Sequence, residues 1–423
     1  MQNILMIGGG VSGQAVAELA LALKINCRIV NDVQNGSDDF DKLFDGVDLV
    51  AVSPGVLPSS KLYNEAVRRG IKVISELELG ISYFPGKLVA VTGTNGKTTT
   101  VELTEFLLNK LGVRAIAAGN IGLPLSAVSA QILRGEIVNA QDLTAVLEVS
   151  SFQLEHTHKL PALAAVLLNV ESDHINRYPG GMDEYRSVKE RIFSDVPQEN
   201  RFYGMSMTGI SSAGKFALQA DKLIFDGKNL LDLHDTALSA PHNQENLLAA
   251  LALVQSAVDD IEEKLDCLCC AVMEFKTGDH RISTVGEFGG VKYIDDSKAT
   301  NPAAVIAAVK SLEKTPCKNI ILIAGGLDKD MDFTPLANLS DYLKKVIVYG
   351  RCGSAVGRVF AGKNLFFDAG NDFALAVDTA KKSAAAGDIV LLSPAAASMD
   401  MFKDYKERGN EFARIVRALC AID

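Results

Sequence analysis

The feature that most constrains the fold is a loop that joins a short apolar run to a helical pattern. The apolar run of residues 89–91 leads into a Gly-Lys-Thr-Thr turn, and a helical pattern follows at residues 101–103. A buried strand, a tight turn and a helix N-terminus together form a phosphate site, because backbone N–H groups converge there and the helix dipole favours anions. The residues of the loop that would contact a nucleotide are Gly93, Thr94, Asn95, Gly96, Lys97, Thr98 and Thr99.

Lys97 and Thr98 give this loop its chemistry. Lys97 adds a positive charge beside the phosphates, and Thr98 offers a hydroxyl to Mg²⁺. The usual phosphate-loop pattern has a glycine six residues before the lysine, and Val91 stands there instead. A glycine-containing turn that binds nothing is the alternative, but nucleotide binding is the preferred interpretation.

Length and charge restrict the class of protein. The chain has 423 residues, of which 48% are hydrophobic, so it can form about three domains with substantial cores. Its net charge of −10 argues against broad binding surfaces for nucleic acid or a membrane. Anionic phosphate ligands would therefore need positive charge that is concentrated locally.

The cysteines and the apolar runs indicate a cytoplasmic protein. The seven cysteines are scattered, and the cluster at residues 267–270 lacks zinc-site spacing, so we expect reduced and mostly buried thiols. The apolar run at the start is too short for a signal peptide, and no run of about 18 apolar residues predicts a membrane span.

Apolar runs alternate with helical patterns along the chain, which predicts an α/β protein with parallel sheets covered by helices. We expect three domains, at residues 1–80, 81–278 and 279–423. Strands are predicted at residues 4–7, 27–30, 48–52, 71–74, 145–149, 164–170, 291–295, 319–324, 345–349 and 388–392, and a helix at 246–258. The stretch of residues 195–235 has no clear pattern.

The first predicted strand is followed by a glycine-rich turn. Gly8, Gly10 and Gly13 fit the pattern G-x-G-x-x-G, and Asp32 lies at the end of the next strand. This pattern suits any diphosphate, because the glycines let the backbone approach the ligand. A nucleotide other than NAD(P) is preferred; NAD(P) binding and close helix–strand packing without a ligand are the alternatives.

Three residues of the central block extend the phosphate site. Glu148 ends an apolar strand, where a carboxylate beside a phosphate loop suits Mg²⁺. His174 follows the next strand; alone it would be assigned to the surface, but its neighbours favour a role in the site. Lys189 borders the apolar side of a predicted helix, and from the pattern alone a surface lysine is the better interpretation.

The C-terminal block carries further polar residues after apolar strands. Because strand C-termini of an α/β sheet converge on one crevice, Lys298, Lys329 and Ser398 are predicted to share a site. Together with Arg281, these lysines supply the local positive charge that anionic ligands require.

The sequence resembles the Mur ligases of peptidoglycan synthesis over residues 1–423. Among these ligases it is most similar to the members that add D-glutamate. The stretches that carry the resemblance are residues 91–99, 119–124, 148–155, 242–243, 296–301 and 393–412. The run Asp-Ser-Lys-Ala-Thr-Asn at 296–301 points to D-glutamate, and the acceptor motif Asp-Asn-Pro-Arg of the diaminopimelate-adding relatives is absent. The N-terminal block argues against folylpolyglutamate synthetases, which lack that domain.

The resemblance implies an N-terminal Rossmann-like UDP-binding domain, a central ATPase domain of the P-loop type and a C-terminal Rossmann-like domain. It implies ATP-dependent ligation of D-glutamate to UDP-N-acetylmuramoyl-L-alanine in the cytoplasm, with two Mg²⁺ ions, and we expect a monomer. The implied UDP-substrate residues are Gly10, Ser12, Asp32, Ser53, Pro54, Gly55, Asn120 and Ser150.

The resemblance also assigns the other ligands. Besides the loop, Asn243, Asn246, Arg281 and Asp296 would contact ATP. D-glutamate would contact Lys298, Thr300, Lys329, Ser398 and Tyr405. Thr98 and Glu148 would bind one Mg²⁺, and His174 with a carbamylated Lys189 would bind the second; Lys97, His174 and Lys189 would be catalytic.

Two other classes of protein stay open at this level. A nicotinamide-dependent oxidoreductase would use the N-terminal glycines, but it would leave the loop at Lys97 without a role. A nucleotide-binding regulator without turnover would not need so many polar residues at strand ends.

Overall fold

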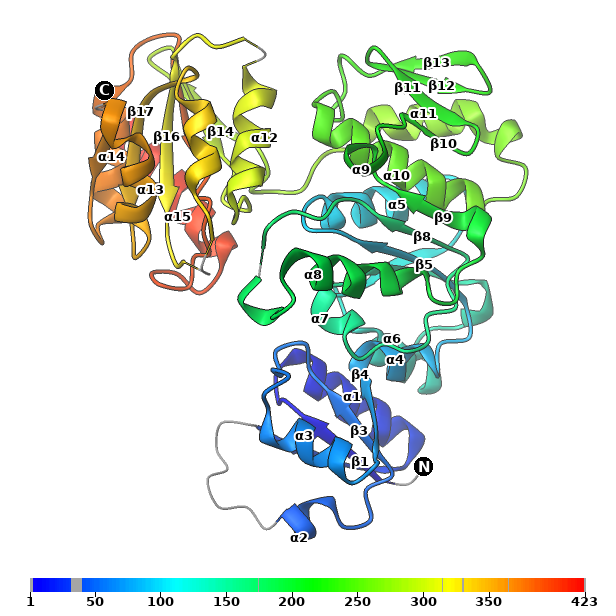
Figure 1. Ribbon diagram of the computed structural model, residues 1–423. Coiled ribbons are helices and arrows are strands. Elements are labelled where there is room, and N and C mark those ends of the chain that lie inside the picture. The colour runs from blue at the N-terminus through cyan, green and yellow to red at the C-terminus, as the bar shows by residue number, and fades with distance from the viewer. Residues whose placement is uncertain are drawn as a thin grey trace. The chain divides into compact units, whose positions relative to one another are not determined.

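The computed structural model describes residues 3–31, 40–173, 175–313, 315–328, 331–363 and 365–421. The chain forms two compact units (Figure 1). The first comprises Met1–Val170 and Met182–Lys276, and the second comprises Glu171–Gly181 and Thr277–Asp423. The predicted boundary at residue 279 lies close to Thr277, and the division into three domains stays a prediction.

The first unit begins with a four-stranded parallel sheet. Its strands are β1 (Asn3–Ile7), β2 (Asn26–Val30), β3 (Leu49–Val52) and β4 (Lys72–Ser75), and its helices are α1 (Val11–Leu23), α2 (Phe40–Phe44), α3 (Lys61–Arg68) and α4 (Glu76–Ile81). The strand order is β2-β1-β3-β4. Ile4 and Met6 pack into one core while Leu5 and Ile7 pack into another, so β1 is buried on both faces. A continuous apolar run is typical of such a strand, and the four predicted strands are confirmed.

A second parallel sheet in the same unit carries the phosphate loop. Its strands are β5 (Lys87–Thr92), β6 (Ala115–Gly119), β7 (Thr144–Glu148), β8 (Ala164–Leu167) and β9 (Arg201–Tyr203), in the order β6-β7-β5-β8-β9. The accompanying helices are α5 (Lys97–Lys110), α6 (Leu125–Leu133), α7 (Ser151–Leu154), α8 (Gly181–Glu190), α9 (Met205–Thr208), α10 (Pro241–Ala257) and α11 (Leu265–Glu274). The central position of β5 places the loop amid the neighbouring strand ends.

A small antiparallel sheet follows, in the stretch without a predicted pattern. Its strands are β10 (Ser212–Ala213), β11 (Phe216–Gln219), β12 (Lys222–Phe225) and β13 (Lys228–Asp232). Asp226 and Gly227 both have positive φ, which is the backbone of a two-residue hairpin turn. The Asp-Gly pair is a typical sequence signal for such a hairpin. The preceding turn uses Ala220 and Asp221, and this pair gives no such signal.

The second unit has one mixed six-stranded sheet. Its strands are β14 (Ser283–Phe288), β15 (Val291–Asp295), β16 (Ile320–Gly325), β17 (Leu343–Tyr349), β18 (Phe366–Asp368) and β19 (Ile389–Leu392), and its helices are α12 (Pro302–Leu312), α13 (Gly353–Phe360), α14 (Phe373–Ser383) and α15 (Tyr405–Cys420). The order is β14-β15-β19-β16-β17-β18, with only the β14–β15 pair antiparallel among the described strands. The sequence predicted β15, β16, β17 and β19, but neither β14 nor the short parallel strand β18.

Within the first unit, α4 and α6 join the first sheet to the second through a close helix contact. A Cβ on Gly80 would lie 2.6 Å from the backbone nitrogen of Ser126, so only glycine fits this approach. The buried Glu76 accepts a hydrogen bond from the same N–H through Oε1 at 2.8 Å. Its Oε2 has no partner among the described residues, and burial raises the pKa of this carboxyl to about 7.

The prediction of mostly buried cysteines is wrong. All seven are free thiols, but only Cys352 is buried, and Cys267, Cys270 and Cys317 are exposed. Part of the error arises because α11 buries Leu268 while Cys267 and Cys270 of the same helix are exposed and Cys269 is half-buried. Among the helices that the structure describes, all fall short of the length and apolarity that a membrane crossing requires.

Candidate active site

The phosphate loop has the predicted strand–turn–helix form. Strand β5 ends at Thr92, and α5 begins at Lys97. Gly93 and Gly96 have φ of +156° and +85°, and a Cβ on Gly96 would lie 2.3 Å from Oδ1 of Asn246. The two glycines are therefore required by backbone conformation and by close packing, and the loop keeps its shape without the glycine that Val91 replaces.

The Lys97 ammonium lies against the loop itself. Its Nζ donates to the carbonyls of Gly93, at 2.9 Å, and of Thr94, at 2.8 Å. These carbonyls hold the positive charge at the N-terminus of α5, where an anion is also favoured by the helix dipole. Lys97 is thus placed where the phosphate-loop interpretation requires it.

Lys189 is buried, so the interpretation as a surface lysine is wrong. It is only 1% exposed, its Nζ donates to the Gly93 carbonyl at 2.8 Å, and it lies 4.7 Å from the ring centroid of Tyr185. The hydroxyl of Tyr185 lies 3.4 Å from Oγ1 of Thr94. The inner face of α8 therefore lies against the loop, and Lys189 contacts the loop directly.

Glu148 lies at the end of β7, in register with Val91 of β5. Its side chain is 2% exposed; Oε1 accepts from Nδ2 of Asn120 at 2.7 Å, and Oε2 has no partner among the described residues. A buried carboxylate oxygen without a partner suits a cation. With the Thr98 hydroxyl it would form an all-oxygen donor set, as Mg²⁺ prefers when phosphates supply the other ligands; this pairing stays a prediction.

No group of three or more His, Cys, Asp or Glu side chains suited to a metal occurs in the described ranges. The fit to Mg²⁺ therefore depends on one carboxylate, one hydroxyl and a bound phosphate, which is a usual arrangement for this ion. Of the predicted second set, His174 lies outside the described residues, and the carbamylation of Lys189 stays a prediction.

Helix α10 carries both Asn243 and Asn246, and Asn246 packs beneath the phosphate loop. Oδ1 of Asn246 accepts from the Thr100 hydroxyl at 3.3 Å, beneath Gly96, and Nδ2 of Asn243 donates to the Ala237 carbonyl at 3.2 Å. The Ser150 hydroxyl caps α7 and bonds to Gln153, and its predicted place along the substrate path stays a prediction.

The N-terminal glycine turn and the predicted residues after β3 come together. Oγ of Ser53 donates to the Gly8 carbonyl at 3.2 Å, and a Cβ on Gly8 would lie 2.7 Å from the Ser53 side chain. Gly10 is the N-cap of α1, so Ser12 lies in the first turn of that helix, and Pro54 and Gly55 follow Ser53 directly. Asp32 lies outside the described residues, whereas the neighbouring Asn31 accepts from the Gly9 N–H at 2.8 Å.

The second unit holds the other predicted ATP residues. Asp296 follows β15 and accepts from the Ser393 hydroxyl at 2.7 Å. Burial raises the pKa of Asp296 to about 8, against the lowering effects of that hydrogen bond and of the charge of Arg281. The carboxyl therefore favours its neutral form at pH 7. Beside it, Nδ1 of His280 lies 2.6 Å from Oδ2 of Asp295.

Two of the predicted D-glutamate residues are in contact. Nζ of Lys298 lies 4.1 Å from the ring centroid of Tyr405, which is a cation–π distance. Ser398 is buried after β19, and Thr300 is half-buried before α12. Lys329 lies outside the described residues, so its predicted place beside Lys298 stays a prediction.

A buried arginine, which the sequence pattern does not reveal, connects these loops. Arg408 of α15 is 0% exposed and donates to the hydroxyl and carbonyl of Ser297, at 2.9 and 2.8 Å, and to the Ala396 carbonyl at 3.1 Å. The Ser297 hydroxyl in turn donates to the Tyr405 carbonyl at 2.8 Å. An arginine in an amphipathic helix carries no sequence signal for burial, because its partners come from distant loops.

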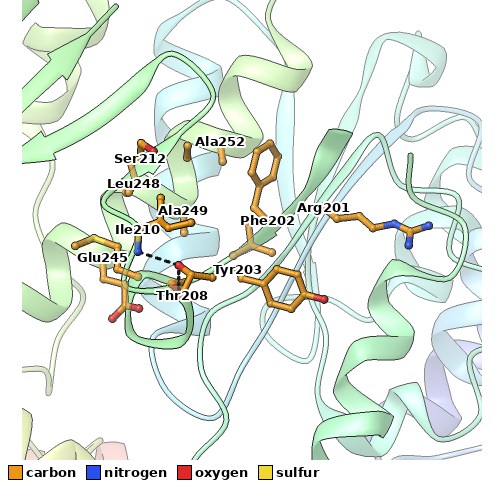
Figure 2. Close-up of a pocket in the computed structure, with 14 residues that line it drawn as sticks. Arg201, Phe202, Tyr203, Thr208, Ile210, Ser212, Glu245, Leu248, Ala249 and Ala252 are labelled. Carbon is orange, nitrogen blue, oxygen red and sulfur yellow. Dashed lines mark hydrogen bonds between the residues drawn. The ribbon is translucent and has the colours of Figure 1, made fainter. Parts of the chain in front are cut away.

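A separate cavity of about 210 Å³ lies between α10 and the segment from β9 to β10 (Figure 2). Its walls are mainly apolar and include Phe202, Ile210 and Leu248, with Glu245 at one side. The Ile210 N–H donates to the Thr208 hydroxyl at 3.1 Å. None of the predicted site residues lines this cavity, so it is distinct from the phosphate site.

Comparison with known proteins identifies the family. Residues 91–211 match the Mur ligase middle domain, and residues 280–396 match the Mur ligase glutamate ligase domain. A UDP-N-acetylmuramoylalanine–D-glutamate ligase of Dechloromonas aromatica is 36% identical over 99% of this chain and 98% of its own. One of Rubrobacter xylanophilus is 37% identical over 88% of this chain and 86% of its own.

Solved structures with the same fold are more distant in sequence. The UDP-N-acetylmuramate–alanine ligase of Thermotoga maritima has a TM-score of 0.61 at 16% identity, covering 99% of this chain and 100% of its own. The folylpolyglutamate synthase of Mycobacterium tuberculosis has a TM-score of 0.58 at 17% identity, covering 82% of this chain and 93% of its own. On its sequence relatives and domain matches, the chain belongs to the Mur ligase family, among the UDP-N-acetylmuramoylalanine–D-glutamate ligases.

Proposed function

We propose that this protein joins D-glutamate to UDP-N-acetylmuramoyl-L-alanine in an ATP-dependent amide ligation. The observation that carries the proposal is the phosphate loop, where Lys97 follows β5 and the buried Glu148 ends the neighbouring strand β7 of the same sheet. The identity of the relatives over almost the whole chain supports the same acceptor and amino acid.

The chemistry explains why cations gather at the loop. A carboxylate is a poor electrophile, so ATP would convert the carboxylate of the UDP substrate to an acyl phosphate. The amine of D-glutamate then attacks the carbonyl, and a tetrahedral intermediate expels phosphate. Two unit charges 4 Å apart repel by about 4 kcal/mol at an effective dielectric of 20, and Lys97 offsets part of that repulsion.

Mg²⁺, when bound, would neutralise charge on the phosphate oxygens. We assign one ion to Glu148 and Thr98, whose oxygens fit it. A second ion would be held by His174 and Lys189, provided that carbamylation gives Lys189 an anionic oxygen. The burial of Lys189 against the Gly93 carbonyl supports a role at this place, since an exposed lysine would contribute nothing there.

The two units divide the remaining roles. In the first, Gly10, Ser12, Asp32 and residues 53–55 would hold the UDP portion, with Asn120 and Ser150 along the muramoyl-alanine path. In the second, Arg281 and Asp296 would contact ATP. Lys298, Thr300, Lys329, Ser398 and Tyr405 would receive D-glutamate, whose two carboxylates suit the lysines. We place the protein in the cytoplasm as a monomer, where the precursor and ATP are available.

Phosphate release from ATP tests this assignment. We expect release only when UDP-N-acetylmuramoyl-L-alanine and D-glutamate are both present, because the amine is needed to complete each turnover. L-lysine and meso-diaminopimelate serve as control amino acids. Equal release with either of them would refute the D-glutamate assignment, and release without any UDP substrate would refute the acceptor.

A further inference from the structure

We propose that Asn169 is a positioning residue that sets the shape of the phosphate loop and thereby the affinity for ATP. The inference rests on the proposed function, because it names a further residue for the same nucleotide site. Asn169 follows β8 by two residues and belongs to none of the site positions assigned above.

The side-chain amide of Asn169 makes three hydrogen bonds to two consecutive loop residues. Its Oδ1 accepts from the N–H of Thr94 at 3.1 Å and from the N–H of Asn95 at 2.8 Å. Its Nδ2 donates to the carbonyl of Asn95 at 3.2 Å. The backbone carbonyl of Asn169 also accepts from the Thr94 N–H, at 3.0 Å. One residue thus satisfies three backbone groups of the loop.

The sheet explains why an asparagine at this position reaches the loop. Strand β8 runs beside β5, with Leu167 in register with Thr92. Two residues beyond this pair, Asn169 is level with Thr94. The side chain must both accept and donate hydrogen bonds, and among short side chains only an amide offers a carbonyl oxygen together with an NH₂ group.

These bonds determine where the Lys97 ammonium lies. The peptide unit on the N-terminal side of Thr94 points its N–H to Asn169, and the Gly93 and Thr94 carbonyls accept from Nζ of Lys97. Turning the Thr94 peptide groups would therefore move the carbonyls that hold the ammonium. Asn169 acts through the loop on Lys97 and does not itself need to touch the nucleotide.

Asn169 also determines which loop donors face an anion. Because the Thr94 and Asn95 N–H groups are directed to its Oδ1, phosphate binding falls to the donors at the start of α5, beginning with Gly96 and Thr98. The first N–H groups of a helix have no intrahelical acceptor, so they are suited to this task. The loop is preorganised for this use before ATP arrives.

The variant Asn169→Ala tests the inference, with Asn109→Ala as a matched control. Asn109 lies at the other end of α5, where its amide makes the same kinds of bonds to the backbone of Glu105 and Ala115. We expect the KM for ATP to rise at least about tenfold in Asn169→Ala, because the loop loses its three hydrogen bonds to the side-chain amide. The KM for the UDP substrate and for D-glutamate stay within about twofold in both variants.

Binding of a non-hydrolysable ATP analogue, measured by calorimetry on the full chain, gives the readout that does not need turnover. A dissociation constant that rises in Asn169→Ala but not in Asn109→Ala supports the positioning role. An unchanged constant, or an equal rise of all three KM values, overturns it. If the wild type binds the analogue but shows no acceptor-dependent phosphate release, the proposed function fails while the role of Asn169 is still measured.

A second variant covers the case in which Asn169→Ala does not fold. Asn169→Asp keeps both acceptor bonds to the Thr94 and Asn95 N–H groups, so we expect a melting temperature near that of the wild type. It loses the donor to the Asn95 carbonyl and adds a negative charge near the phosphates. We therefore expect weaker binding of the analogue, with recovery at higher salt; wild-type affinity in this variant would overturn the inference.

Discussion

Replacing Lys97 by alanine is expected to lower turnover by at least about 10²-fold, which is the scale of losing one preorganised charge partner of a transition state. The ammonium is held by the Gly93 and Thr94 carbonyls at the N-terminus of α5, so its charge is in place before the phosphates bind. The measurement is kcat for phosphate release at saturating concentrations of all three substrates.

Lys110→Ala is the matched control, since Lys110 lies at the C-terminal end of the same helix and pairs with Glu274 on the surface. We expect this variant to keep turnover within about twofold of the wild type, because exposed ion pairs contribute little. Near-normal turnover in Lys97→Ala, with ATP saturating, would contradict the role assigned to Lys97.

Replacing Glu76 by glutamine is expected to raise the stability of the variant relative to the wild type as the pH rises. Burial raises the pKa of Glu76 to about 7 in the folded chain from the ordinary value of 4.5. The unfolded state binds fewer protons between these values, so the free energy of unfolding falls as pH rises from 4.5 to 7 and stays lower above it. This pKa shift corresponds to a loss of about 3 kcal/mol in the free energy of unfolding of the wild type. The glutamine variant does not undergo this loss, because glutamine does not titrate.

Calorimetric melting at pH 4.5 and pH 8 measures this effect. The melting temperature of Glu76→Gln relative to the wild type should be higher at pH 8 than at pH 4.5. Glu199→Gln serves as the control, because Glu199 is exposed and should leave the comparison unchanged. A constant difference between Glu76→Gln and the wild type at both pH values would show that Glu76 does not titrate between them.

The strands and the phosphate loop could be predicted because their determinants are local. A parallel strand buried on both faces leaves a continuous apolar run, as at Ile4–Ile7, and the loop between β5 and α5 needs its glycines for positive φ. Glu148 was predicted in the same way, as a carboxylate at the end of such a strand. The antiparallel sheet was missed because one of its turns uses Ala220 and Asp221 in place of glycine.

The missed or misassigned residues have partners that are distant in sequence. Lys189 bonds to Gly93, 96 residues earlier, and Arg408 bonds to Ser297, 111 residues earlier. Neither helix pattern distinguishes a buried polar group from an exposed one, because hydrophobic periodicity records only the apolar residues. Asn169 gives no signal either, since an asparagine after a strand is typical of any loop.

The sequence by itself determined the α/β class, the succession of strands and helices, the phosphate loop and the resemblance to the Mur ligases. These follow from apolar periodicity, from glycines that a tight turn requires, and from residue types at fixed spacing. Only the tertiary structure decided that Lys189 is buried, that Arg408 connects two loops and that Asn169 holds the phosphate loop. The physical reason is that the burial and hydrogen bonding of a polar side chain depend on which strand ends the sheet brings together. The local sequence pattern does not determine the order of the strands.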